Sequence, residues 1–216
     1  SGFNDTASNN QFIGFQSGIN NTSGYSNTFS GFQSGYNNTS GIDNNFSGFQ
    51  SGFTNTTGNR NGFSGLLSGQ LNTTGSDNEF SGWHSGINNT IGNSNIFTGR
   101  EAGANNTTGS SNTFTGHLSG FGNTTGGANV YYGQQSGASN KTGSNNLFLG
   151  YQSGLSDTAS NNQFIGFQSG ANNISGTNNQ FSGMLSGYGN TTGSSNFFYG
   201  NGSGQANTTG SNNHFV

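Results

Sequence analysis

The sequence predicts an all-β fold, a β-solenoid with one 17-residue repeat per coil and about thirteen coils. Three observations lead to this class. An aromatic residue recurs at a nearly constant step, the positions around it alternate between constant and variable, and Gly and Asn contribute 41 and 39 of the 216 residues. Gly and Asn are poor helix formers that favour turns, and a fixed period of this kind is typical of stacked repeats.

The repeat is defined by the aromatic residue of the motif aromatic-x-Gly. Its step is 17 residues throughout, except for one step of 16 between Phe148 and Phe164. We expect these side chains to stack in one ladder, about 4.8 Å apart, which is the spacing of neighbouring β-strands. The expected Phe ladder comprises Phe12, Phe29, Phe46, Phe63, Phe80, Phe97, Phe114, Tyr131, Phe148, Phe164, Phe181, Phe198 and Phe215.

A strand is expected around each aromatic. The Asn two residues before it and the Gly two residues after it are constant, whereas charged residues such as Asp43, Glu79 and Arg100 occupy the variable positions. This period of two predicts that Asn, the aromatic and Gly face inward. The expected structural Asn ladder comprises Asn27, Asn44, Asn61, Asn78, Asn95, Asn112, Asn129, Asn146, Asn179, Asn196 and Asn213.

A threonine column is expected to face solvent, because Lys141 occupies one of its positions. The constant glycines are expected at corners with positive φ or where neighbouring coils approach closely. The surface Thr ladder comprises Thr22, Thr39, Thr56, Thr73, Thr90, Thr107, Thr124, Thr158, Thr191 and Thr208.

Residues 1–216 are interpreted as a single repeat array, with shortened, 16-residue-type copies near 1–16 and 153–168. Both copies read DTASNNQFIGFQSG, at Asp5–Gly18 and Asp157–Gly170, which indicates a second-order repeat of about nine coils. Neither end shows a capping segment, and the chain stops just after an aromatic position. We therefore expect it to be part of a longer array.

Two other architectures fit the sequence poorly. A helical repeat needs good helix formers and more than about 30 residues per unit. Disorder of the Phe-Gly type found in nuclear-pore proteins does not need spacers of fixed length, whereas the step here is constant. One buried aromatic per coil does not offset the conformational entropy of 17 ordered residues, so hydrogen bonds between coils and side-chain ladders must contribute.

Composition excludes several kinds of partner. With only Arg60, Arg100 and Lys141 as basic residues and a net charge of −3, neither nucleic-acid binding nor a membrane-binding face is expected. No apolar run approaches the roughly 18 residues that would insert into a membrane. The absence of cysteine excludes disulfides, thiol nucleophiles and cysteine zinc sites.

No cofactor or metal is expected either. Calcium-binding β-rolls need Asp at fixed repeat positions, whereas Asp5 and Asp157 occur only in the shortened copies, where a turn-capping role is the better interpretation.

No enzymatic activity is expected. His84, His117 and His214 lie in different columns, which favours exposed variants over a shared site. Asp77 and Glu79 lie near each other on the expected outer face, but no other copy repeats the pair. We therefore do not expect acid–base catalysis from them.

Two surface features suggest partners. An aromatic stripe, which follows the motif glycine, is expected to pack neighbouring rods together, with carbohydrate binding as an alternative. Asn-x-Ser/Thr sequons recur, as at Asn20, Asn37, Asn88 and Asn105, and could carry glycans if the source is a eukaryote or its virus. Turn and ladder roles explain the same residues. The possible assembly stripe comprises Phe15, Phe32, Phe49, Trp83, Tyr151 and Phe167.

The segment Asn140–Gly154, NKTGSNNLFLGYQSG, resembles the NTTGSNNTxxGYQAG type of repeat. That type is familiar from bacterial and phage tail-fibre-like surface proteins and, more distantly, from the heads of trimeric autotransporter adhesins. The resemblance covers the whole array. It implies an elongated, β-rich rod on a cell or virion surface or in the extracellular space, often trimeric, that serves as a fibre shaft or an adhesive surface.

Three functions follow from these observations. The first is a structural extracellular fibre, in which rods of the same chain associate end to end or laterally into filaments. The second is an adhesin or tail-fibre shaft that displays a binding domain not present in this sequence. The third is ice binding, in which the outward Thr ladder orders water.

Overall fold

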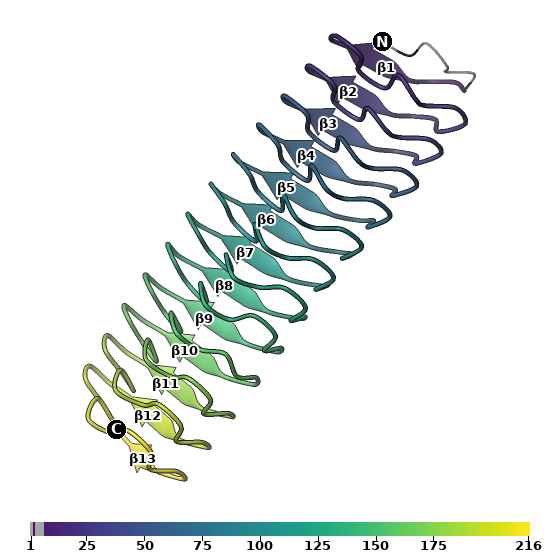
Figure 1. Ribbon diagram of the computed structural model, residues 1–216. Coiled ribbons are helices and arrows are strands. Elements are labelled where there is room, and N and C mark those ends of the chain that lie inside the picture. Colours follow the sequence, from purple (N-terminus) through teal and green to yellow (C-terminus); the bar gives the residue numbers. More distant parts are fainter. Residues whose placement is uncertain (1, 3–6) are drawn as a thin grey trace.

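The computed structural model describes residue 2 and residues 7–216, and these residues form an all-β fold of thirteen short strands without a helix. Each strand is centred on the aromatic of one repeat, or ends on it in the last case (Figure 1). The strands are β1 (Gln11–Ile13), β2 (Thr28–Ser30), β3 (Asn45–Ser47), β4 (Gly62–Ser64), β5 (Glu79–Ser81), β6 (Ile96–Thr98), β7 (Thr113–Thr115), β8 (Val130–Tyr132), β9 (Leu147–Leu149), β10 (Gln163–Ile165), β11 (Gln180–Ser182), β12 (Phe197–Tyr199) and β13 (His214–Phe215).

All strands pair in parallel with the strand of the next coil, so the order in the single sheet is the order in the chain. The register places each aromatic opposite the next one, as Phe29 opposite Phe46, and it is kept across the 16-residue step from Phe148 to Phe164. Hydrogen bonds between coils continue outside the strands. These features confirm the predicted β-solenoid.

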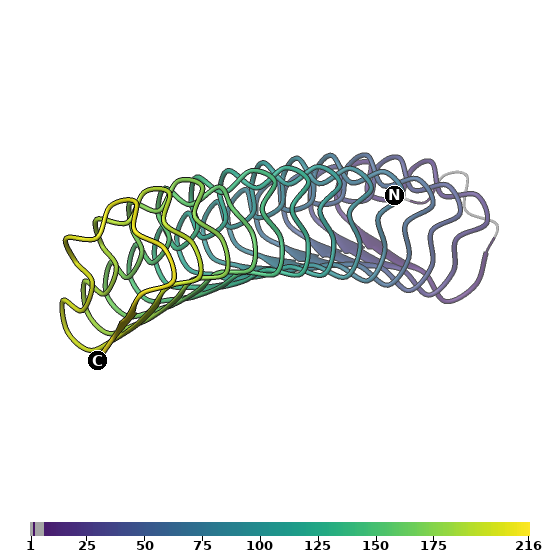
Figure 2. The same cartoon turned by 90° about the horizontal axis from the view of Figure 1, so that it is seen from below.

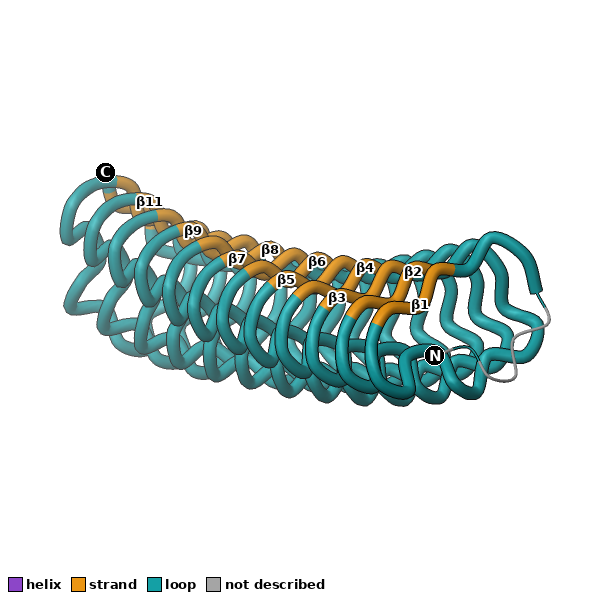
Figure 3. Tube along the Cα trace, turned by 90° about the horizontal axis from the view of Figure 1, so that it is seen from above, coloured by secondary structure: helices purple, strands orange, loops and turns teal. Residues whose placement is uncertain are grey.

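The coils build a long rod that curves and twists gently, with the two ends of the chain at its opposite ends (Figures 1 and 2). The strands occupy one side of the rod, and turns and loops form the rest of its circumference (Figure 3). Columns of equivalent residues therefore run along the rod, and each column is a potential surface.

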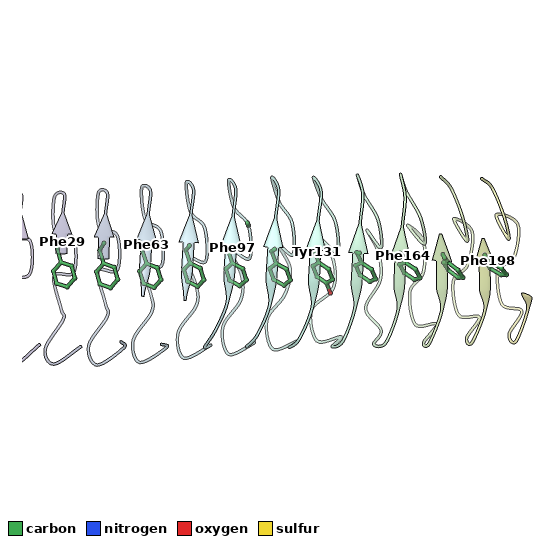
Figure 4. Close-up of a cluster of buried hydrophobic side chains, with 12 residues drawn as sticks. Phe29, Phe63, Phe97, Tyr131, Phe164 and Phe198 are labelled. Atoms are coloured by element: carbon green, nitrogen blue, oxygen red, sulfur yellow. The ribbon is translucent and has the colours of Figure 1, made fainter. Parts of the chain in front are cut away.

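The core of the rod is a single pile of aromatic rings (Figure 4). From Phe29 to Phe198 the rings are at most 1% exposed, and successive ring centroids along the whole pile lie 4.7–5.0 Å apart. Phe12 and Phe215 stack on the two ends of the pile and are more exposed. Offset stacking at this distance adds to the free energy gained from burial alone.

The strand asparagines form a ladder beside the rings. The backbone N–H of Asn44 donates to Oδ1 of Asn27 at 3.0 Å, and Nδ2 of Asn27 donates to the carbonyl of Gly41 at 2.8 Å. Equivalent bonds recur along the rod, and Asn162 of the shortened coil continues the column. Each amide thereby satisfies polar groups that burial would otherwise leave unpaired.

A second buried asparagine column, which the sequence-based prediction did not include, donates to the same glycine carbonyls as the first. In this column Nδ2 of Asn38 donates to Oδ1 of Asn21 at 2.7 Å and to the carbonyl of Gly41 at 3.0 Å. Asp157 takes the place of Asn in the shortened coil. The second Asn column comprises Asn21, Asn38, Asn55, Asn72, Asn89, Asn106, Asn123, Asn140, Asn173, Asn190 and Asn207.

The glycine two residues after the aromatic does not face inward, so this part of the prediction was wrong. Gly31 is only half-buried, has φ +141°, and approaches Gly48 of the next coil so closely that a Cβ would collide with the Gly48 carbonyl. The glycine after the buried serine is also left-handed: Gly35 has φ +58°, and a Cβ there would collide with the ring of Phe29. Conformation and space both require glycine at these positions.

We expect Phe97→Ala, in the middle of the pile, to lower the free energy of unfolding by about 3–5 kcal/mol, because it removes a buried ring and leaves a cavity. Urea denaturation followed by circular dichroism measures this loss. Tyr132→Ala is the matched control, since Tyr132 is 61% exposed. Equal losses in the two variants would contradict the ring pile as the core.

Candidate functional site

The threonine column lies at the surface and is tied to the backbone. Oγ1 of Thr90 donates to the carbonyl of Thr107 at 2.9 Å, and Oγ1 of Thr107 donates to the carbonyl of Thr124 at 2.9 Å. The same bond recurs along the column, including Thr124 to Lys141. Because the hydroxyl hydrogens are used between coils, the methyl groups are left to contact whatever covers this surface.

A groove of about 660 Å³ lies over this column and is lined mainly by apolar atoms. Phe121 forms part of its wall and is 37% exposed. The coils on either side place Ala104 and Ala138 in the column of Phe121, and the next residue is Gly122, so small residues surround the ring. The groove comprises Leu71, Asn88, Thr90, Asn105, Thr107, Phe121, Gly122, Thr124, Ala138, Ser139 and Lys141.

The predicted aromatic stripe also lies at the surface. Phe32 stacks on Phe15 and on Phe49, with ring centroids 5.4 and 5.1 Å apart, and Tyr151 stacks on Phe167 at 5.3 Å. The rings of Phe32 and its neighbours therefore cover each other's faces and present their edges. Sugars stack on the faces of aromatic rings, so this arrangement suits packing against apolar groups better.

Five consecutive coils contribute an apolar side chain to this stripe. Leu66, which was not among the predicted stripe residues, fills the place between Phe49 and Trp83 and is 42% exposed. Met184, which follows Phe167 in the column, is 48% exposed and likewise extends the second apolar segment. The continuous segment is called the ridge, and it comprises Phe15, Phe32, Phe49, Leu66 and Trp83.

Polar residues end the ridge. Arg100, His117 and Gln134 follow Trp83 in the same column. The guanidinium carbon of Arg100 lies 4.6 Å from the Trp83 ring centroid, and the ring of His84 stacks on Trp83 at 3.5 Å. Partial burial lowers the pKa of His84, which favours the neutral imidazole against the indole.

The two carboxylates considered for acid–base chemistry have different partners. Asp77 accepts from Nε and Nη2 of Arg60 at 2.6 and 2.8 Å, and this hydrogen bonding lowers the pKa of Asp77. The Glu79 carboxyl lies against the backbone of Gly62, so closely that a Cβ at position 62 would collide with it. Partial burial raises the pKa of Glu79. The arrangement describes a surface ion pair and a folded-down side chain rather than a paired acid and base.

The histidines and the sequons do not converge on a site. His117 and His214 are exposed on different coils, and the His214 ring lies tilted against Phe197 at 4.8 Å. The sequon residues are half-buried and pair between coils, as Asn88 donates to Oδ1 of Asn105 at 3.2 Å. Asn20 donates to Asn37 in the same way at 3.2 Å.

The Asp157 carboxyl accepts a hydrogen bond from the backbone of Ala159, two residues on, which is the turn-capping contact predicted for it, whereas Asp5 lies outside the described residues. Asp157 is fully buried in the second Asn column and accepts from Nδ2 of Asn140 at 3.0 Å, from Nδ2 of Asn162 at 3.1 Å, and from Nδ2 of Asn173. Burial nevertheless dominates and raises the pKa of Asp157 to about 8.

Asp157 also reverses the direction of the amide ladder. In the other coils each Asn donates to the coil before it, but Asn140 donates forward to Asp157 and accepts from the N–H of Gly143 at 2.8 Å. As a result, Oδ1 of Asn123 is buried without a hydrogen-bond partner. The exchange of Asn for Asp157 has thus left an amide oxygen unpaired two coils away.

Among residue 2 and residues 7–216, no group of three or more His, Cys, Asp or Glu side chains could hold a metal ion. The same residues include no helix long and apolar enough to cross a membrane. No family model, curated protein or solved structure matches the chain significantly. The candidate functional features are therefore the ridge and the groove, which the structure itself defines.

We expect the free energy of unfolding to fall as the pH rises from about 4 to 8, by about 1.4 kcal/mol per pH unit. The folded pKa of Asp157, about 8, lies above its unfolded value of about 3.9. The contribution of the buried, protonated carboxyl is therefore complete below about pH 4. It is lost between about pH 4 and 8, because in that range the aspartate ionises in the unfolded chain but stays protonated in the rod. Urea denaturation across this range measures the slope.

The variant Asp157→Asn restores an amide that both donates and accepts, so it should flatten the slope and stabilise the rod at pH 7 by up to about 4 kcal/mol. Asp43→Asn, which removes an exposed aspartate, is the control. A wild-type stability that is flat between pH 4 and 8 would refute the buried, proton-linked carboxyl.

Tyr131 offers a further test, because its ring is fully buried in the pile and its hydroxyl, although it lies near the side chain of Asn146, makes no hydrogen bond of good geometry. Tyr131→Phe should raise the free energy of unfolding by about 1–3 kcal/mol, since it removes an unpaired buried polar group. Thermal and urea unfolding measure the change. A loss of stability would show that the hydroxyl is satisfied in solution.

Proposed function

We propose that the chain is a structural rod that associates with further copies of itself into an extracellular fibre or filament. The single observation that carries this proposal is the continuous stack of coils, in which the aromatic pile and the hydrogen-bonded ladders run through the whole described rod. Such a stack resists bending and extension because every coil is bonded to both neighbours.

The surface supports self-association. Monomeric proteins rarely expose large contiguous apolar patches, yet the ridge places five apolar side chains in a row, each 38–63% exposed. At the Trp83 end of this segment the charges are those of Arg100 and Glu101, which form an ion pair at 3.5 Å. Rods of net charge −3 repel one another only weakly, so apolar contact can bring them together.

The proposed role is non-catalytic and needs no cofactor. The resemblance of Asn140–Gly154 to repeats of tail-fibre-like surface proteins supports a place outside the cell or on a cell or virion surface. It also supports the second candidate, a shaft for an adhesin or tail fibre, since both roles use the same stiff rod. For ice binding the Thr column is less suitable, because a groove hollows it and its hydroxyl hydrogens are bound internally.

Electron microscopy and X-ray diffraction of concentrated protein test the fibre. We expect filaments or bundles with a meridional reflection near 4.8 Å, because the coils stack along the fibre axis. Dispersed single rods at every concentration and ionic strength tried would refute self-assembly, and a meridional reflection at another spacing would refute alignment of the rods with the fibre.

A further inference from the structure

We infer that the ridge of one rod docks into the groove of a second copy of this chain. The inference rests on the proposed function and adds to it which two surfaces meet. The ridge and the groove are different surfaces of one molecule, so the contact is heterologous and leaves one unused ridge and one unused groove on each pair. Contacts of this kind propagate into open assemblies.

The ridge and the groove match in length. The ridge takes one side chain from each of the coils of β1 to β5, from Phe15 to Trp83. The groove takes its lining from the coils of β4 to β8, from Leu71 to Lys141. A row of five apolar side chains therefore meets a hollow that is five coils long.

The ridge and the groove also match in spacing, and this match selects a copy of the same chain as the occupant. The coils of any two copies repeat at the same interval, shown by ring centroids 4.7–5.0 Å apart in the pile. Each ridge side chain therefore meets an equivalent position of the groove along the whole contact. A partner with another repeat would lose register after a few side chains.

The two surfaces also match in chemistry. The ridge presents ring edges and a leucine, and the groove presents mainly apolar atoms around Phe121 with no carboxylate in its lining. Nδ2 of Asn88 donates to Oδ1 of Asn105 at 3.2 Å, so one donor and one acceptor of the polar lining are already paired when an apolar ridge covers them.

The contact area indicates how the assembly behaves. An aromatic side chain buries about 200 Å², so the exposed fractions of the ridge correspond to roughly 450 Å². A stable interface buries about 800 Å² on each partner. A single contact is thus weak, and association should depend steeply on concentration, with stability gained when each rod uses both its ridge and its groove.

Complementation between two disabled variants tests the inference. The ridge variant combines Phe32→Glu and Phe49→Glu, and the groove variant combines Asn105→Glu and Ser139→Glu. Each should sediment as a monomer at concentrations where the wild type associates. A 1:1 mixture should form dimers and nothing larger, because it contains one intact ridge and one intact groove per pair.

The controls use the same columns outside the two surfaces. Gln134→Glu with Asn201→Glu is the control for the ridge, and Ser156→Glu with Asn172→Glu is the control for the groove. Both should associate as the wild type does. Circular dichroism of each variant monitors the fold, and a variant with an altered spectrum is replaced by its single substitutions.

Cross-linking provides a second readout, and the natural chain has no cysteine to interfere. Under mild oxidation, Phe49→Cys should form a disulfide heterodimer with Asn105→Cys, which pairs the centre of the ridge with the centre of the groove. It should not do so with Asn172→Cys, which lies in the same column beyond the groove.

The outcomes separate this inference from the proposed function. If the wild type forms filaments but the mixture stays monomeric, or if Phe49→Cys forms only homodimers, the ridge-in-groove contact is wrong while the fibre stands. If the wild type is monomeric at every concentration, both fail.

Discussion

The rise of one coil, just under 5 Å, is the constraint on which the rest of the structure depends. Every side chain inside the rod lies directly over its counterpart in the next coil, so a residue is accepted there only if it can interact with its own copy. Flat aromatic rings stack on one another at this distance. Asparagine can also do so, because its amide both donates and accepts. Aspartate fits this pattern less well, because it only accepts when ionised, and burial raises the pKa of Asp157 to about 8, which favours the protonated form.

Asp157 shows what happens when this rule is broken. Its oxygens accept from the asparagines before and after it, and the reversed amide of Asn140 leaves Oδ1 of Asn123 unpaired. The shortened coil explains why aspartate is tolerated there. Asn162, the strand asparagine of the same coil, reaches Asp157 at 3.1 Å and supplies a third donor, and the carbonyl of Ala159 takes over the contact that a glycine makes elsewhere. The register of the sheet is therefore kept at the cost of a local fault.

The sequence was sufficient to predict the solenoid, the aromatic pile and the strand asparagines, because these positions follow the period of two around a strand. The second Asn column could not be predicted in this way because it lies between the strands, where alternation does not indicate which side chains face inward. Its signal was nevertheless present: the second Asn of each NN pair, such as Asn38, is almost constant, whereas the first, such as Asn37, varies. The glycine two residues after the aromatic was wrongly predicted to face inward because it does follow the alternation. Gly31 continues the alternation in sequence, but its left-handed backbone has already left the strand.

The groove could not have been predicted, because it depends on sizes in several neighbouring columns at once. A ring at Phe121 forms a wall only because Ala104, Ala138 and Gly122 around it are small. The ridge, in contrast, is visible in one column. Both surfaces consist of outer columns, whose residue types vary from coil to coil. The inner columns are restricted to residues that can interact with the equivalent residue of the next coil. Identical inner columns give the rod its length and stiffness but cannot distinguish one coil from another. Any contact that joins two rods at a defined offset must therefore be specified by the outer columns, and the ridge and the groove are the places where those columns depart furthest from uniformity.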